Sequence, residues 1–306
     1  MGRYAGVTPG VGDLLRIVDI RTKVVSISSL LVGSAWAHAK APEQFSWTLL
    51  ALLVAATLAI DMGTTGFNSY FDFRSGVDTR ESDRERFKAL VQRDIDPRVA
   101  RDLSAVLFAL AVPLGLAIGA RAGWGVVAAG ALGMLLGYLY SGGPHPISRT
   151  PVGEFFAGGL LGGVLVTVAA CVHTQRLDAA TVLLGLPASL IIAAILSTNN
   201  ACDRVGDARA GRRTLAIVLG PERAHLPVFA LVAAAFAATA MLAVLRVLPP
   251  KSLLPMVPAA LFAWRTLAAM QARGFSHDSK PANMGGMSLA FVAFTACFVA
   301  AIVLAT

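Results

Sequence analysis

The sequence predicts an all-α, polytopic membrane protein, and three observations support this prediction. Of the 306 residues, 56% are hydrophobic and only 14% are charged, whereas a soluble domain carries roughly 25% charged residues. The mean hydropathy is +0.68. Long apolar runs alternate with clusters of charge, and a helix needs about 20 mostly apolar residues to cross a bilayer. A soluble single domain is therefore excluded, and several membrane spans are expected.

Nine apolar runs between the charge clusters predict nine transmembrane helices. In chain order they cover residues 24–38, 46–67, 103–120, 123–140, 152–173, 179–198, 224–245, 252–270 and 285–305. Two starts carry a capping residue followed by proline, Asp96-Pro97 and Thr150-Pro151, the arrangement expected where a helix begins. Because no clear repeat or low-complexity tract divides the chain, residues 1–306 are expected to form a single membrane-embedded domain.

The basic residues predict the orientation of these helices. With the N-terminus in the cytoplasm, the inner segments hold 20 Lys and Arg and the outer segments hold 5, as the positive-inside rule expects. The net charge of +8 therefore needs no nucleic-acid partner, and we expect a multi-pass protein of the inner cell membrane. A cleaved secretory signal ending within residues 35–39 is the alternative for the first run, but Asp13 and Asp19 precede that run.

Two polar motifs follow apolar spans at the start of the two longest inner loops. The first contains Asn68, Asp72, Gly76 and Asp78, and the second contains Asn199, Asn200, Asp203, Asp207, Arg212 and Arg213. Residues four apart project from one face of a helix, so Asn68 and Asp72 share a face, as do Asn199, Asp203 and Asp207. Asp78 is the exception, because it follows Asp72 by six residues, and Gly76 can turn the chain between them at low cost. The spacing thus predicts two carboxylate clusters at the cytoplasmic mouth of the bundle.

Carboxylates beside arginines at a membrane edge favour a magnesium and diphosphate site. Mg²⁺ takes one or two carboxylates plus substrate phosphates, so two clusters suit two ions that hold one diphosphate. The predicted metal ligands are Asp72, Asp78, Asp203 and Asp207, with Asp72 and Asp203 as the catalytic carboxylates. Basic side chains would add charge-assisted hydrogen bonds to the same oxygens. The candidates are Arg74, Arg80, Arg84, Lys88, Arg212 and Arg213, and the last two are favoured because they follow the second cluster closely.

An apolar bundle with a diphosphate site at its mouth predicts an isoprenoid diphosphate as substrate. Its head group would lie on the metal ions and its chain within the bilayer. The reaction would ionise the allylic carbon–oxygen bond and trap the cation with an electron-rich acceptor. An ion-coupled transporter is the alternative from a different class, but its acids are expected near the middle of the membrane rather than at the helix ends.

The two motifs resemble those of the UbiA superfamily of membrane prenyltransferases. The second motif, N-N-x-x-D-x-x-x-D-x-x-x-G-x-x-T-L, matches residues 199–215 without gaps. The resemblance implies nine helices around a central cavity and Mg²⁺ as the cofactor. It assigns Asn68, Asp72 and Asp78 to the first Mg-diphosphate motif and Asn200, Asp203 and Asp207 to the second. Arg212 stands where many relatives have lysine, and Ser69 where many have a further acid.

Within the superfamily, residues 140–154 and 21–23 are similar to those of the group that prenylates 1,4-dihydroxy-2-naphthoate. This similarity implies transfer of a polyprenyl chain to the naphthoate ring in menaquinone biosynthesis, with loss of carboxylate and diphosphate. The partners would be a polyprenyl diphosphate, the aromatic acceptor and membrane lipid. A UbiA-type enzyme that uses another aromatic acceptor is the alternative.

Polar residues in or near the spans complete the candidate site. Asp61 lies seven residues before Asn68 and therefore two turns deeper on the same face. It either lines the cavity or bonds to a neighbouring threonine. Tyr140 ends the fourth span and either contacts the substrate or anchors the helix at the interface. The predicted substrate-binding residues are Asn68, Asn199, Asn200, Arg74, Arg212, Arg213, Tyr140 and Asp61.

Overall fold

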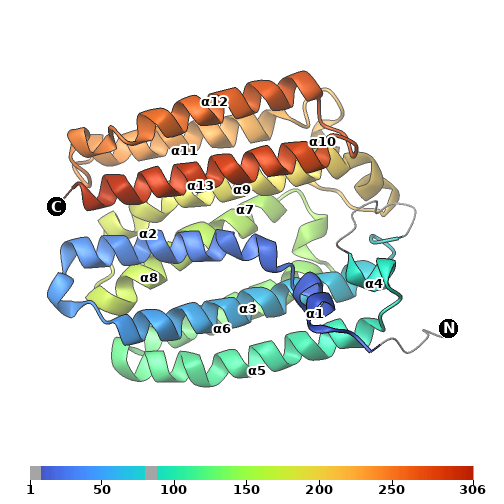
Figure 1. Cartoon of the computed structure of the whole chain (residues 1–306), viewed down its shortest axis with the longest axis horizontal. Coiled ribbons are helices and arrows are strands. Elements are labelled where there is room, and N and C mark those ends of the chain that lie inside the picture. The colour runs from blue at the N-terminus through green and yellow to red at the C-terminus, as the bar shows by residue number, and fades with distance from the viewer. Residues whose placement is uncertain (1–7, 80–87, 306) are drawn as a thin grey trace.

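The computed structural model describes residues 8–79 and 88–305, and this part of the chain is a bundle of helices without strands (Figure 1). The long helices are α2 (Val24–Lys40), α3 (Trp47–Arg74), α5 (Pro97–Ala122), α6 (Trp124–Ser141), α9 (Ala179–Arg209), α11 (Leu226–Val244), α12 (Met256–Arg273) and α13 (Lys280–Val303). A further span is built from α7 (Gly153–Gly158), the π-helical turn η4 (Gly159–Val164) and α8 (Leu165–Thr174). The short elements are α1 (Val11–Ile17), η1 (Ile20–Lys23), η2 (Pro42–Gln44), α4 (Ala89–Gln92), η3 (Ile147–Arg149), α10 (Leu215–Leu219) and η5 (Pro250–Leu253).

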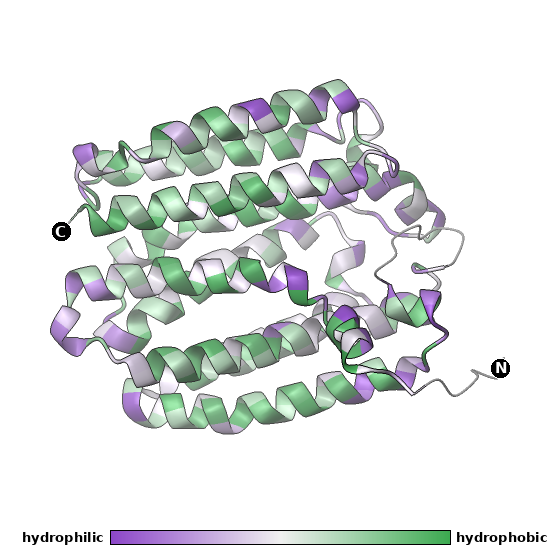
Figure 2. Ribbon diagram, in the orientation of Figure 1, coloured by the Kyte–Doolittle hydropathy of each residue, from purple (hydrophilic) through white to green (hydrophobic). Residues whose placement is uncertain are grey.

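Eight segments of the described chain are long and apolar enough to cross a bilayer. They are α3, α5, α6, the α7–α8 segment, α9, α11, the η5–α12 segment and α13. Apolar residues fill the middle of these helices and polar residues gather at both ends of the bundle (Figure 2). The predicted polytopic helical membrane architecture is confirmed.

The ninth predicted span corresponds to α2, which has 17 residues. That length is at the lower limit of a transmembrane helix. α2 packs against α8 and α13 inside the bundle, and its Val32 and Trp36 belong to the main apolar core. The total of nine spans and the cytoplasmic N-terminus stay predictions.

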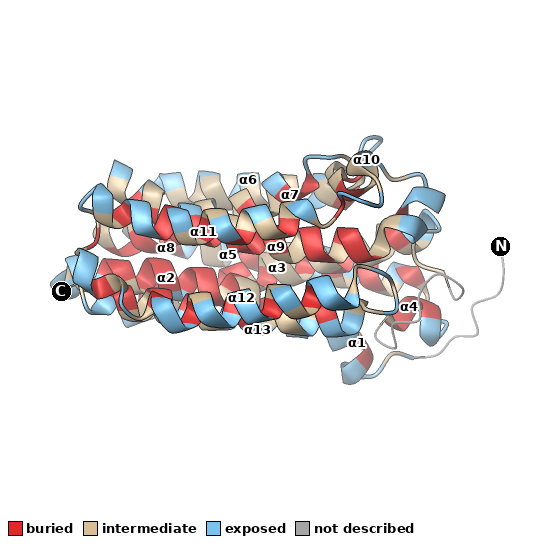
Figure 3. Cartoon of the chain, turned by 90° about the horizontal axis from the view of Figure 1, so that it is seen from above, coloured by how far each residue is buried: buried red, intermediate tan, exposed pale blue. Residues whose placement is uncertain are grey.

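α9 is the central helix of the fold. It contacts α7, α8, α11 and α13, and half of the residues in its membrane-spanning apolar stretch are buried inside the bundle. Buried residues concentrate between the helices and exposed residues on the outer faces (Figure 3). Because α9 also carries the second polar motif at its C-terminal end, this packing fixes the position of that motif.

The predicted helix start at Asp96 is confirmed, and the one at Thr150 is wrong. α5 begins at Pro97, and the Asp96 carboxylate accepts a hydrogen bond from the Arg98 backbone N–H at 2.8 Å. α7 begins only at Gly153. The Thr150 hydroxyl donates to the Ile147 carbonyl at 2.7 Å, so it closes the preceding turn and does not cap the helix.

Small residues allow the π-helical turn η4 to pack directly on the α9 backbone. A Cβ atom placed on Gly162 would lie 2.3 Å from the Ser189 nitrogen and 2.4 Å from its Cα. Gly158, four residues earlier, meets the Ser189 carbonyl in the same way, at 2.4 Å. Such small residues at four-residue spacing let membrane helices approach closely.

Gly162→Ala is therefore expected to destabilise the protein by about 1–3 kcal/mol, because the methyl group overlaps backbone atoms that cannot rotate away. The melting temperature of the purified protein in detergent measures this effect. Gly159→Ala is the matched control, since a Cβ at Gly159 meets no atom within 4 Å. Equal melting temperatures for the two variants would contradict the close contact.

Candidate functional site

The first residues of both polar motifs lie on the last turns of long helices, and Asp78, Arg212 and Arg213 follow the helix ends. α3 extends to Arg74 and α9 to Arg209, past the predicted ends at residues 67 and 198. Asp72, Asp203 and Asp207 are therefore presented by regular helix at one end of the bundle, as the four-residue spacing predicts. In Figure 1 this is the end that carries α4 and α10.

A glycine turns the chain back just after each of these two helices ends. Gly76 has φ +71°, and the backbone N–H groups of Val77 and Asp78 donate to the Asp72 carbonyl at 3.0 and 3.2 Å. Gly211 has φ +75°, and the Arg212 N–H donates to the Asp207 carbonyl at 3.0 Å. These left-handed glycines are typical of helix C-termini. They return Asp78 and Arg212 to the carboxylates that precede them.

Arg212 joins the two motifs. Its Nη2 lies 2.7 Å from Asp72 Oδ1 and its Nη1 lies 3.4 Å from Asp207 Oδ1. Asp72 is only 7% exposed, and Asp207 is similarly buried. Burial alone would lower the pKa of Arg212, but the carboxylates of Asp72 and Asp207 outweigh it, so the pKa is raised above its usual value. The acidic clusters of α3 and α9 thus converge on one guanidinium group.

The two remaining carboxylates also have cationic partners. Asp78 binds Lys88 at 3.0 Å, and Asp203 binds Lys280 Nζ at 2.6 Å and His277 Nδ1 at 3.4 Å. Sequence analysis missed His277 and Lys280 as site residues, because they lie more than 70 residues from Asp203. Each acid of the two motifs therefore lies beside a basic side chain.

The asparagines connect the motifs to the rest of the bundle. Asn68 Oδ1 accepts a hydrogen bond from the Ser141 hydroxyl at 2.5 Å, and Asn200 donates to the buried Glu154 carboxylate at 2.9 Å. Asn199 instead lines the central cavity. Each motif thus holds one amide that faces the cavity, since Asn68 lines it too.

Two predicted substrate-binding residues, Arg74 and Arg213, lie apart from this cluster. Arg74 is exposed and donates to the Tyr70 hydroxyl at 3.2 Å, and Arg213 is exposed while its backbone N–H donates to the Arg149 carbonyl at 2.9 Å. Ser69 donates to the Ile17 carbonyl at 2.9 Å and so binds the N-terminal segment. Arg80 and Arg84 lie outside the described residues.

A cavity of about 610 Å³ extends from the motifs into the bundle. Its walls come mainly from α3, α5, α6, α7–α8 and α9, and they are largely apolar. Asn68, Tyr140 and Asn199 line it together with Asp61, which lies deeper along α3. Tyr140 therefore faces the interior and not only the membrane interface, and Asp61 lines the cavity.

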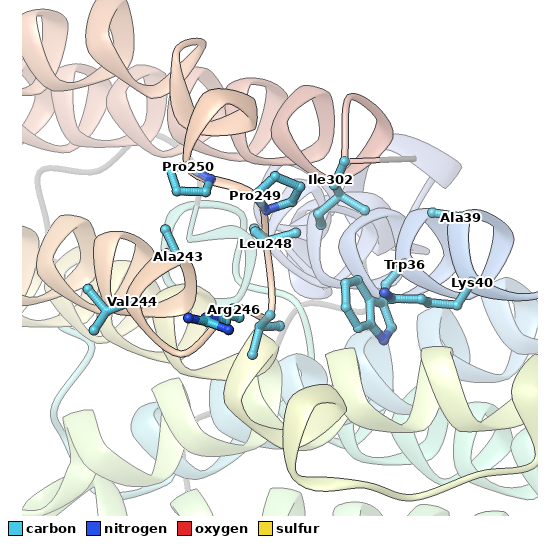
Figure 4. Close-up of a pocket in the computed structure, with 12 residues that line it drawn as sticks. Trp36, Ala39, Lys40, Ala243, Val244, Arg246, Leu248, Pro249, Pro250 and Ile302 are labelled. Atoms are coloured by element: carbon cyan, nitrogen blue, oxygen red, sulfur yellow. The ribbon is translucent and has the colours of Figure 1, made fainter.

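A second, smaller pocket lies at the opposite end of the bundle (Figure 4). Trp36 and Lys40 of α2, Arg246, and Pro249 and Pro250 lie around it, and no acid lines it among the described residues. It is remote from the first motif, because Lys40 lies near the start of α3 at Trp47, whereas that motif lies at the other end of α3. We therefore assign the candidate site to the central cavity and its polar end.

The sequence pattern that defines the UbiA prenyltransferase family matches residues 26–294. The chain belongs to this family. The solved structures agree with the fold: a UbiA homolog from Archaeoglobus fulgidus bound to GPP and Mg²⁺ superposes with a TM-score of 0.67 at 17% identity, covering 95% of this chain and 99% of that one. An apo UbiA homolog from Aeropyrum pernix gives a TM-score of 0.66 at 19% identity, covering 90% and 97%.

Among curated relatives, this UbiA family member is 35% identical over 189 residues to the 1,4-dihydroxy-2-naphthoate octaprenyltransferase of Bacillus subtilis. The match covers 62% of this chain and 59% of that protein. It is 29% identical over 212 residues to the Mycobacterium tuberculosis protein of the same name, covering 67% of this chain and 69% of the relative. The chain thus spans only part of the length of these relatives.

The residues at the motifs suit a charged ligand. No group of three or more acidic, histidine or cysteine side chains in residues 8–79 and 88–305 is close enough to hold a metal ion by itself. Four buried atoms in or beside the motifs nevertheless have no hydrogen-bond partner among the described residues: Asp207 Oδ2, Glu154 Oε2, Arg212 Nε and Thr214 Oγ1. Buried polar atoms are normally satisfied, and a cation at the carboxylates with an anion at the guanidinium would satisfy the first three. The donor set therefore fits Mg²⁺ together with a diphosphate.

Proposed function

We propose that this UbiA family member transfers a polyprenyl group from an isoprenoid diphosphate to an aromatic acceptor in a magnesium-dependent reaction. The observation that carries the proposal is the convergence of Asp72 and Asp207 on Arg212, one helical turn or more beyond Asn68 and Asn199, which line a largely apolar cavity. A diphosphate head and a hydrocarbon chain need this combination of surfaces.

The acids and bases of the motifs would share the diphosphate. Asp72, Asp78, Asp203 and Asp207 would hold the magnesium ions, which neutralise the diphosphate and make it a better leaving group. The basic side chains Arg212, Lys88 and Lys280 lie beside these carboxylates and would donate hydrogen bonds to phosphate oxygens. Asn68, Asn199 and Tyr140 line the junction between this polar end and the apolar cavity, where the allylic carbon would lie.

The apolar walls serve the second half of the reaction. When the allylic carbon–oxygen bond breaks, a ring carbon of the acceptor must reach the cation before water does, and a dry cavity prevents that side reaction. Two residues that line the cavity, Leu116 and Val164, are 45% and 40% exposed. This exposure fits a cavity that is open at the side of α5 and η4, and a long prenyl chain would extend there toward the lipid.

The acceptor we propose is 1,4-dihydroxy-2-naphthoate, in menaquinone biosynthesis. The Bacillus subtilis relative supports this choice by its name and its 35% identity. On the ring, a carbon–carbon bond would form as the carboxylate leaves. The distribution of basic residues supports a place in the inner membrane with the mouth of the site facing the cytoplasm.

The test uses the purified protein in detergent with an allylic diphosphate and either 1,4-dihydroxy-2-naphthoate or 4-hydroxybenzoate. We expect a prenylated naphthalene product by mass spectrometry, and we expect EDTA to lower diphosphate release by roughly a hundredfold or more. Product from 4-hydroxybenzoate alone would reassign the acceptor. Absence of diphosphate release with every acceptor, in protein that stays folded, would favour an ion-coupled transporter.

A further inference from the structure

An ion pair buried in the cavity wall lies outside the proposed diphosphate site. Lys23, at the end of η1, is 4% exposed, and its Nζ lies 2.6 Å from Asp61 Oδ1 on α3. The other carboxylate oxygen, Oδ2, accepts a hydrogen bond from the Ser26 hydroxyl at 2.7 Å. Removing two charges from water is costly unless both are paired. The bundle therefore holds this carboxylate in a fixed orientation.

The hydrogen bonds of the pair show which of the two side chains can still bind a ligand. The three donors of the Lys23 ammonium group meet Asp61 Oδ1, the Thr65 hydroxyl at 2.7 Å and the Asp61 carbonyl at 3.4 Å. The carboxylate has about four acceptor sites, and Lys23 and Ser26 use one on each oxygen. Asp61 lines the cavity, so the unused sites are available to a ligand there. The pair can accept further hydrogen bonds, whereas Lys23 has no donor to spare.

The position of the pair separates it from the metal motifs. Asp61 precedes Asn68 by seven residues, which places it about 10 Å deeper along α3. Among the described residues that line the cavity, Asp19 is the other acid, and it binds the exposed Arg21. Thr22, Val25 and Thr65 also line the cavity, and the Thr65 hydroxyl donates to the Asp61 carbonyl at 2.9 Å, so Asp61 has a polar neighbour in a largely apolar wall.

We propose that Asp61 binds a ring hydroxyl of the aromatic acceptor and that Lys23 is the positioning residue that orients it. This inference rests on the proposed function. Because the Lys23–Asp61 pair is neutral overall and offers acceptors only, it favours an uncharged hydrogen-bond-donating group of the ligand over an anionic group. A phenol or hydroquinone hydroxyl is such a donor. Donation of its O–H to the carboxylate also shifts electron density into the ring, which suits a ring that must attack a cation.

The first experiment measures the KM of the Asp61→Asn variant for each of the two substrates and compares it with that of the wild type. With 1,4-dihydroxy-2-naphthoate and farnesyl diphosphate, we expect the acceptor KM to rise about tenfold or more, as for loss of a hydrogen bond to a charged group. The diphosphate KM should stay within about twofold. Asp102→Asn, the same change on an exposed acid of α5, is the matched control. Equal changes in both KM values, or an unchanged acceptor KM, would overturn the proposal.

Lys23 is tested through its effect on Asp61. Lys23→Met should raise the acceptor KM as Asp61→Asn does, Lys23→Arg should restore part of the loss, and the double variant Lys23→Met/Asp61→Asn should be no worse than Asp61→Asn alone. The double variant also removes both charges, so it reports on the subsite even where one buried unpaired charge prevents folding. Additive losses would show that Lys23 does not act through Asp61.

A binding measurement separates this inference from the proposed reaction. The acceptor alone, without a prenyl diphosphate, should raise the melting temperature of the wild-type protein and not that of the double variant. Its O-methyl ethers, which cannot donate, should stabilise neither. Stabilisation of both proteins by the acceptor would overturn the subsite even if prenyl transfer is established, whereas absence of prenyl transfer despite selective binding would overturn the reaction alone.

Discussion

Replacing Asp72 or Asp203 by alanine is expected to lower turnover by at least about a thousandfold, because each change removes a carboxylate where the charge of the departing diphosphate must be balanced. Both variants should stay folded in detergent. After Asp72→Ala, Arg212 still lies 3.4 Å from Asp207. After Asp203→Ala, Lys280 is left at the edge of the bundle, where α13 begins. The rate of diphosphate release and the melting temperature together measure the outcome.

Asp102→Ala provides the matched control for these two variants. Asp102 is exposed and pairs with the exposed Arg101 at 2.8 Å on the outer face of α5, so its loss should change neither turnover nor folding. Near-normal rates in a well-folded Asp72→Ala or Asp203→Ala protein would remove the hypothesis that these acids hold magnesium.

The local features of the site could be predicted because they depend on short stretches of chain. The four-residue spacing places Asp72 on one helix face with Asn68, and Asp207 on one face with Asp203, and the turn predicted at Gly76 is present with φ +71°. The position of Arg74 also follows from local geometry, although the sequence analysis did not apply that geometry to this residue. Arg74 follows Asp72 by two residues, which is about 200° around a helix. Arg74 therefore points away from that acid and contacts Tyr70.

The residues that complete the site could not be predicted because they come from distant helices. Lys280 meets Asp203 across 77 residues, and Lys23 meets Asp61 across 38. Their charges fit the positive-inside pattern, which gives no indication that they pair with these acids. Such partners are set by which helices pack together, and the periodicity of one sequence records each apolar face but not its neighbour.

Arg212→Met is expected to reduce both turnover and stability, because this one side chain joins the two motifs. Its guanidinium contacts Asp72 and Asp207, and removing it leaves two buried carboxylates without their shared cation. Breaking a buried pair in this way costs about 3–5 kcal/mol, so the melting temperature should fall clearly. Loss of a charged donor to the diphosphate should lower kcat/KM by roughly a hundredfold or more.

Arg212→Lys distinguishes charge from geometry at this position. Lysine keeps the positive charge but cannot present two parallel nitrogens to two carboxylates, so we expect turnover within about tenfold of the wild type and a stability between the wild type and Arg212→Met. If lysine were as damaging as methionine, the forked contact itself would be essential. If methionine were tolerated, the convergence of the two acidic motifs on Arg212 would have no role in the reaction. Because magnesium would reduce the repulsion between Asp72 and Asp207, adding it should recover part of the stability lost in Arg212→Met and little in the wild type.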